Sequence, residues 1–196
     1  FRYRFDGTAQ YIFIKDSYSA TDVTLSKDDI SNLQINPTSF SDLITRQDIS
    51  YERHPANNTY KNTTNSSNST ARTNWNIQAK ENIENTSLDY YVSPEIPNSP
   101  SSNPNDDFYT YYDNIFGDIK LMISCDIINS SKWVTENDAS NPLDPLEVGS
   151  VIDFNNSNMF PETPMGYNSA SWSGIKFIIT NMTRGLGKMS IKARQI

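Results

Sequence analysis

Cysteine and histidine are almost absent from this sequence, which has 196 residues but only Cys125 and His54 of these two types. A disulfide needs two cysteines, and a zinc site built from cysteine and histidine needs several such ligands, so the chain alone can form neither. Long apolar runs are also missing, which excludes a membrane-spanning helix, and no segment has the pattern of a signal peptide. We therefore expect no cofactor, no metal and no insertion into a membrane.

Basic residues are outnumbered, with 16 lysines and arginines against 23 aspartates and glutamates and a net charge of −7. A surface that binds nucleic acid needs clustered Lys and Arg to displace counterions from phosphates, so we expect no sequence-specific nucleic-acid partner. One stretch near the C-terminus reverses the charge locally. This basic stripe is either a solvated strand face or an electrostatic docking surface for an acidic neighbouring subunit, and its members are Arg184, Lys188, Lys192 and Arg194.

Catalytic signatures are missing as well. The sequence contains no G-x-S-x-G, no P-loop and no dinucleotide-binding fingerprint. Its acidic residues are spread along the chain, and a glycosidase pair is defined by separation in space and by one raised pKa, which spacing does not reveal. We predict that the protein is not an enzyme, and we assign no catalytic, cofactor-binding or metal-binding residue.

The clearest structural signal lies at the C-terminus, in residues 172–196. Apolar side chains alternate along both halves of this stretch, which is the two-residue period of a strand. Gly185 and Gly187 lie between the halves, and glycine tolerates the positive φ that a tight reversal needs. We expect a hairpin that closes a small β-barrel, and we expect one of its faces to lie in the core: Ile175, Phe177, Ile179, Met189 and Ile191.

Two more strands are expected in the same half, over residues 119–127 and 143–154. Cys125 falls on the apolar face of the first strand, which favours a buried small hydrophobe over a nucleophile, because the only histidine lies in a different module. The loop 155–171 is unusually apolar for a solvated connection. We expect it to dock on its own barrel or on a neighbouring subunit, through Met159, Phe160, Met165 and Tyr167.

The first half has weaker signals. Aromatic residues alternate with arginines around an Asp-Gly turn pair near the N-terminus, and Ser26 followed by three charged residues is typical of a helix start. The predicted elements are a hairpin over residues 1–14, a short helix from Ser26 to before Pro37, a helical turn over 39–43 and a strand over 44–53.

Composition then divides the chain. Residues 54–73 are almost entirely polar and predict a long solvated loop or the tip of an extended hairpin, and residues 74–92 mix helix and strand signals. Four prolines within residues 94–107 predict a linker. We predict a mainly β protein with a β-rich N-terminal module over 1–93, containing one or two short helices and the polar loop 54–73, then the linker 94–107 and a small β-barrel over 108–196.

The order of motifs resembles a known family. The C-terminal half contains LEVGSVIDF (146–154), a variable loop, KFIITNMTR (176–184) and LGKMSIKARQI (186–196). This order resembles the small β-barrel that ends many tail-tip or baseplate hub proteins of tailed bacteriophages. In the first half DLITRQDISYERHP (42–55), the polar tract and WNIQAKENIENTSLDYYV (75–92) resemble the strand, excursion and return of the upper hub domain.

The resemblance implies a structural virion component. Hub subunits form a ring around the tail axis, so it implies a homo-oligomer that contacts other virion proteins, located in the phage tail after assembly in the host cytoplasm. The chain is shorter than a full hub protein, which implies a fragment or a reduced relative.

Two other functions remain open from the residues alone. One is a carbohydrate-binding or adhesion module, in which Trp75, Trp133 and Trp172 would stack on sugars. The other is a glycan hydrolase that uses paired acids.

Overall fold

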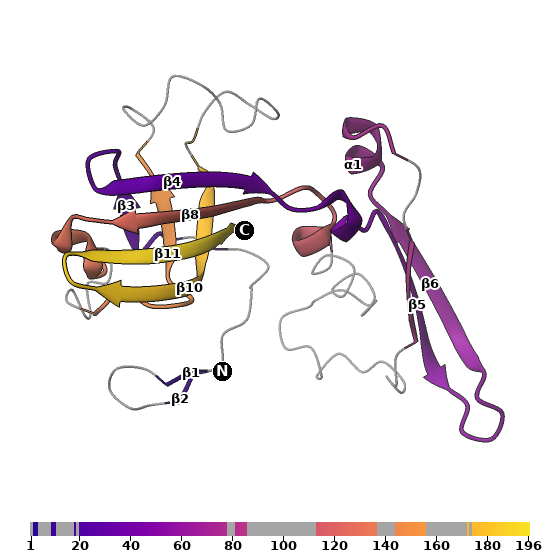
Figure 1. Cartoon of the computed structure of the whole chain (residues 1–196). Helices are drawn as coiled ribbons and strands as arrows, with labels where there is room; N and C mark the ends of the chain where they lie inside the picture. The colour runs from indigo at the N-terminus through magenta and orange to yellow at the C-terminus, as the bar shows by residue number, and fades with distance from the viewer. Residues whose placement is uncertain are drawn as a thin grey trace. The chain divides into compact units, whose positions relative to one another are not determined.

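The computed structural model describes residues 2–3, 9–10, 18, 20–77, 81–85, 113–136, 144–155, 172 and 174–196. It is mainly β, with 44% strand and few short helices, which confirms the predicted fold class. The chain forms two compact units (Figure 1): residues 1–38 together with 120–196 form the first, and residues 39–119 form the second. The second unit is therefore inserted in sequence between strands of the first.

A six-stranded sheet that curls into a half-barrel forms the first unit. All neighbouring strands are antiparallel except β3 and β9, which are parallel. The expected C-terminal hairpin is confirmed, because β10 and β11 pair along most of their length. In spatial order the strands are β3 (Val23–Leu25), β9 (Val151–Phe154), β10 (Lys176–Gly185), β11 (Lys188–Gln195), β8 (Leu121–Ile127) and β4 (Ile30–Pro37).

The division into units differs from the predicted modules. Strands β3 and β4, which we assigned to an N-terminal module over 1–93, pair with β9 and β8 of the C-terminal half. Composition and local periodicity do not show which distant strands pair, so they could not place β3 and β4 beside strands of the C-terminal half. The segment 94–107 lies outside the described residues, and its role as a linker stays a prediction.

The predicted helix after Ser26 is wrong. Asp29 Oδ2 accepts hydrogen bonds from Ser26 N at 2.8 Å and from Ser26 Oγ at 2.6 Å, and these bonds stabilise a turn rather than a helix start. The chain then enters β4, where Asn32 adopts a φ of 54° at a register shift between Ser31 and Gln34. This β-bulge breaks the two-residue period, which explains why β4 was not recognised as a strand.

The core lies on one face of the sheet. Phe177 and Met189 are fully buried, Ile191 is 2% exposed and Ile175 packs against the cluster, which confirms the predicted apolar face of the hairpin. Cys125 is buried among these residues, as predicted. Trp172 lies in the same core cluster and contacts Phe154 edge-on, with the two ring centroids 5.4 Å apart.

The second unit contains a three-stranded sheet with β5 (Arg46–Arg53) between β6 (Tyr60–Ser67) and β7 (Glu81–Asn85). The 3-10 helix η1 (Phe40–Asp42) confirms the expected helical turn. Residues 54–59 join β5 to β6 as the tip of a hairpin, but most of the remaining polar tract up to residue 73 is β6 itself and the helix α1 (Ser69–Asn74). Strand pairing satisfies the backbone groups of β6 that face β5, even though the β6 side chains are polar in sequence.

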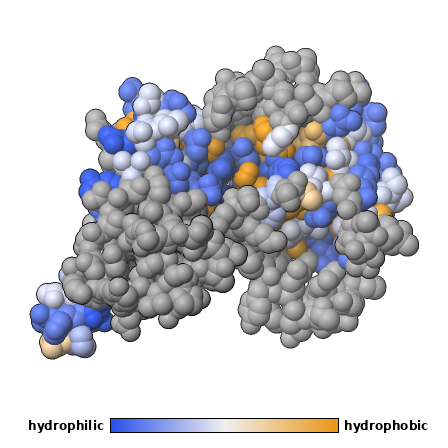
Figure 2. Space-filling view, turned by 180° about the vertical axis from the view of Figure 1, so that it is seen from behind, coloured by the Kyte–Doolittle hydropathy of each residue, from blue (hydrophilic) through white to orange (hydrophobic). Residues whose placement is uncertain are grey.

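Short elements complete the described structure. Strands β1 (Arg2–Tyr3) and β2 (Ala9–Gln10) pair antiparallel, which confirms the N-terminal hairpin, and η3 (Ser130–Trp133) follows β8. None of the helices in the described ranges is long and apolar enough to cross a membrane. Seen from behind, the described surface is mostly hydrophilic, and hydrophobic residues show only in small areas (Figure 2).

The buried face of β11 yields a stability test. Replacing Ile191 by Asp places a carboxylate among apolar side chains, so we expect a loss of unfolding free energy on the order of 4 kcal/mol or more. Urea unfolding followed by circular dichroism measures this loss. Asn181→Asp, at an exposed position of β10, is the control and should unfold within about 0.5 kcal/mol of the wild type. Equal stability of the two variants would contradict the core assignment.

Candidate functional site

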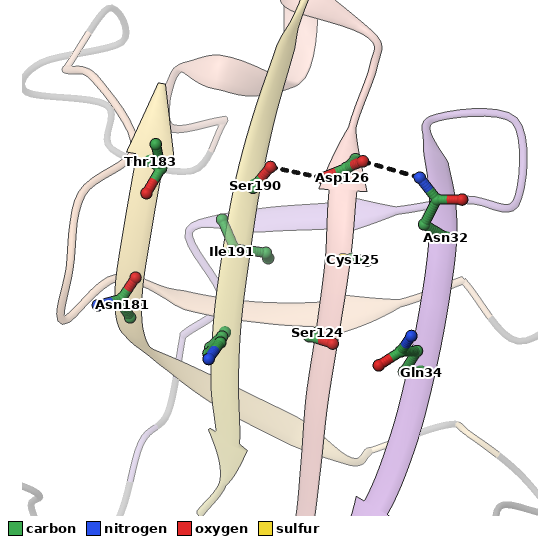
Figure 3. A pocket seen from close by; sticks show the side chains of 10 residues that line it. Asn32, Gln34, Ser124, Cys125, Asp126, Asn181, Thr183, Ser190 and Ile191 are labelled. Atoms are coloured by element: carbon green, nitrogen blue, oxygen red, sulfur yellow. Dashed lines mark hydrogen bonds between the residues drawn. The ribbon is translucent and has the colours of Figure 1, made fainter. Parts of the chain in front are cut away.

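Opposite the core, the six-stranded sheet carries two rows of polar side chains that cross β10, β11, β8 and β4 (Figure 3). The strand register aligns the second row across all four strands and the first row from β10 to β8, whereas Asn32 lies in the bulge of β4, next to the register partner of Asp126. We call the two rows together the polar face. They line a shallow pocket with a volume of about 270 Å³. The first row consists of Thr183, Ser190, Asp126 and Asn32, and the second row consists of Asn181, Lys192, Ser124 and Gln34.

Asp126 is the centre of the first row and is only 8% exposed. Its carboxylate accepts hydrogen bonds from Asn32 Nδ2 at 2.9 Å and from Lys188 Nζ at 2.9 Å. Ser190 Oγ donates a third, short hydrogen bond. The donors come from β4 on one side and from β11 on the other, so the carboxylate links three strands (Figure 3).

The hydrogen bonds determine the charge of Asp126. Those donated by Ser190, Lys188 and Asn32 stabilise the ionised form and outweigh the effect of burial, so they lower the pKa of this carboxyl to about 2. Asp126 is therefore a carboxylate throughout the ordinary pH range. A general acid or base needs a pKa near the working pH, so Asp126 is unsuited to proton transfer.

Cys125 lies next to Asp126 in sequence but on the opposite face of β8. Burial, reinforced by the negative charge of Asp126, raises the pKa of its thiol to about 12. The thiol is therefore protonated at neutral pH and is a poor nucleophile.

The second row is chemically different from the first. Lys192, Gln34 and Asn181 are exposed, and Ser124 is half-buried. Within the part of the chain that the structure describes, none of these four side chains forms a hydrogen bond or an ion pair, whereas Asn32 and Ser190 of the first row are bonded to Asp126. The second row thus presents one cation, two amides and a hydroxyl to solvent.

The predicted basic stripe is only partly available for binding. Lys188 forms the ion pair with Asp126, and Arg184 donates from Nη2 to the carbonyl oxygen of Leu146 at 2.8 Å. Arg194 is half-buried, and Lys192 is exposed on the polar face. A contact with a neighbouring subunit stays a prediction for these residues. The other predicted contact residues, Met159, Phe160, Met165 and Tyr167, lie outside the described residues.

Sequence reasoning missed how the polar face is assembled. The alternation of β8 places Ser124 and Asp126 on the face opposite the core, and that signal was readable. The donors Asn32 and Ser190 could not be matched to Asp126, because they lie on β4 and β11, 94 and 64 positions away from it in the sequence. In the described ranges, no group of three His, Cys, Asp or Glu residues could hold a metal ion.

No protein-family model and no curated protein matches the chain. Among solved structures, one similar chain belongs to the virion of a native gene transfer agent particle, with a TM-score of 0.48 and 9% identity over 91% of this chain and 32% of that one. Another is prophage tail protein gp18 from Listeria monocytogenes EGD-e, with a TM-score of 0.43 and 11% identity over 87% of this chain and 42% of that one.

A third similar structure is the tail protein of prophage MuSo2 from Shewanella oneidensis, with a TM-score of 0.45 and 8% identity over 93% of this chain and 46% of that one. The present chain therefore spans less than half the length of each of these three chains. With TM-scores below 0.5, the likenesses assign neither a family nor a function to the chain.

The lowered pKa of Asp126 predicts a specific loss of stability in acid. A carboxyl whose pKa is lower in the folded than in the unfolded state stabilises the fold above the unfolded value. That contribution is lost as the pH falls from the ordinary value of 3.8 towards about 2. We expect the urea midpoint of the wild type to drop more steeply over this range than that of Asp126→Asn. Asp28→Asn, which removes an exposed carboxylate, should follow the wild-type curve, and parallel curves for all three proteins would refute the assignment.

Burial of Cys125 predicts slow alkylation. Iodoacetamide reacts with the thiolate, so native protein at pH 8 should remain unlabelled while protein in urea is labelled rapidly. Mass spectrometry of timed samples measures both rates. Rapid labelling of native protein that retains its circular dichroism spectrum would show that the thiol is accessible.

Proposed function

We propose that the protein is a structural, non-enzymatic component of a phage tail, hub-like in role, which acts through contacts with other virion proteins and with copies of itself. One observation carries the proposal: the groups of the polar face are suited to binding a partner and not to catalysis. Its carboxylate is held ionised by three donors, the neighbouring thiol is buried and protonated, and a row of polar side chains is left with open hydrogen-bonding capacity.

The assignment to a virion rests on the resemblance of the motifs. Their segments correspond to strands of one sheet, since LEVGSVIDF contains β9, KFIITNMTR covers β10 up to Arg184 and LGKMSIKARQI contains β11.

The tryptophans do not favour a carbohydrate-binding module. Trp172 is 2% exposed and lies in the core, so it cannot stack on a sugar. Trp133 packs against the core and donates from Nε1 to the carbonyl oxygen of Ile127 at 3.2 Å. Trp75 donates from Nε1 to Asp118 Oδ1 at 2.6 Å and makes an edge-on contact with Phe40. Each indole therefore has a structural role.

The polar face also fails to support a glycan hydrolase. The acid catalyst of such an enzyme needs a raised pKa, whereas the pKa of Asp126 is lowered to about 2. A hydrolase site on this face would therefore lack its proton donor.

The proposal is tested in the particle itself. If the protein is a tail component, mass spectrometry of purified particles should detect it in fixed proportion to the other tail proteins. Deletion of its gene should yield particles with incomplete tails, and the intact gene supplied in trans should restore them. Its absence from particles, together with normal tails in the deletion strain, would contradict the proposal.

A further inference from the structure

Strand β6 forms one edge of the three-stranded sheet, and among the strands that the structure describes only β5 pairs with it (Figure 1). The pairing runs without a register shift from Tyr60 opposite Arg53 to Ser67 opposite Arg46. The strand contains no proline and a single charged residue, Lys61. The backbone N–H and C=O groups on its outer side therefore form a regular row on which a further strand can pair.

The other edges of the described sheets carry features that hinder such pairing. Strands β1 and β2 have two residues each, and β7 has five, of which two are glutamates. Strand β3 has three residues, and Glu136 binds backbone groups beside it: Thr24 N donates to Glu136 Oε2 at 3.3 Å, and Glu136 N donates to the carbonyl oxygen of Asp22 at 2.7 Å. Strand β4 is interrupted by the bulge at Asn32 and ends at Pro37. Short length, charge, bulges and proline are the usual protections of a sheet edge, and β6 has almost none of them.

A second copy of the chain does not supply the additional strand in a hub-like ring. Two identical outer edges pair across a two-fold axis, whereas neighbouring copies in a ring are related by rotation about the tail axis and meet through different surfaces. The other described edges that a neighbouring copy could offer are the hindered ones. The additional strand therefore has to come from a different protein.

We propose that the outer edge of β6 binds an extended segment of another virion protein, which becomes the fourth strand of this sheet. The inference deepens the proposed function, on which it rests, by naming the surface and the kind of partner of one contact. Backbone hydrogen bonds provide the recognition, so the segment has to be extended and to lack proline at its bonding positions. Because β6 consists mainly of threonine, asparagine and serine, the matching segment is uncharged or acidic and carries hydroxyl or β-branched side chains.

Hydrogen exchange of the full chain, measured by mass spectrometry for the free protein and for purified particles, tests the inference. Amides on the outer side of an edge strand exchange quickly, and amides bonded to a new strand exchange slowly. We expect the fast-exchanging amides of residues 60–67 to slow by about tenfold or more in particles. Residues 30–37 of β4, an edge strand of the same length, are the control and should change much less. Equal exchange of β6 in the two states would overturn the inference.

Two proline variants test whether the contact is made by the backbone. Neighbouring residues of an edge strand direct their N–H groups to opposite sides, so one of Thr63→Pro and Thr64→Pro removes an outward donor and the other removes a donor to β5. Thermal unfolding identifies the latter by its lower stability. The former should fold and should enter particles about tenfold less than the wild type or lower still. Thr63→Ser and Thr64→Ser keep the N–H group and should enter particles like the wild type.

The outcomes separate this inference from the function on which it rests. Absence of the wild-type protein from particles would remove both. Its presence, together with normal incorporation of the folded proline variant, would overturn only the inference. Protection of β6 in the isolated protein that grows with protein concentration would assign the edge to a second copy and would also overturn it. If neither proline variant folds, the exchange measurement on the wild type decides.

Discussion

A carboxylate shielded from water has to find hydrogen-bond donors, and Asp126 finds them on both strands that flank β8. Asn32 reaches it from β4, and Lys188 and Ser190 reach it from β11. If these donors were absent, the group would be desolvated without compensation, which is among the costliest defects in a folded protein. The bulge of β4 and the polar side of β11 are thus joined through this one group.

The side of β8 that faces the core supplies apolar contacts. Leu121, Ile123, Cys125 and Ile127 alternate with the polar positions and lie in the core. Because β4 and β11 cover the two edges of β8, residues 30–37 and 188–195 meet across a strand that is distant from both in sequence. This topology lets the second unit be inserted between residues 38 and 120 without interrupting the sheet.

A feature can be predicted from the sequence when residues close together in the chain determine it, and cannot when residues far apart in the chain determine it. The C-terminal hairpin, the strand over residues 121–127 and the buried state of Cys125 are set by local alternation, and they could be read directly. Strand β4 could not be read in this way. The positive φ of Asn32 shifts the two-residue period of the strand, and Ser26 and Asp29 before it resemble the start of a helix. Polar β6 had no apolar period to recognise and is a strand only because β5 pairs with it. The polar face is predictable only in part. The alternation that points its residues away from the core is local, but the pairing that brings them together joins strands that are far apart in the sequence.

The geometry of the polar face assigns a permanent negative charge to the Asp126 carboxylate. Carbon-13 NMR of the Asp126 carboxyl group during an acid titration of the folded protein measures this most directly, with Asp126→Asn identifying the resonance. We expect a midpoint near 2. A midpoint at or above the ordinary value of 3.8 would contradict it, because the three donors would then not be holding the charge.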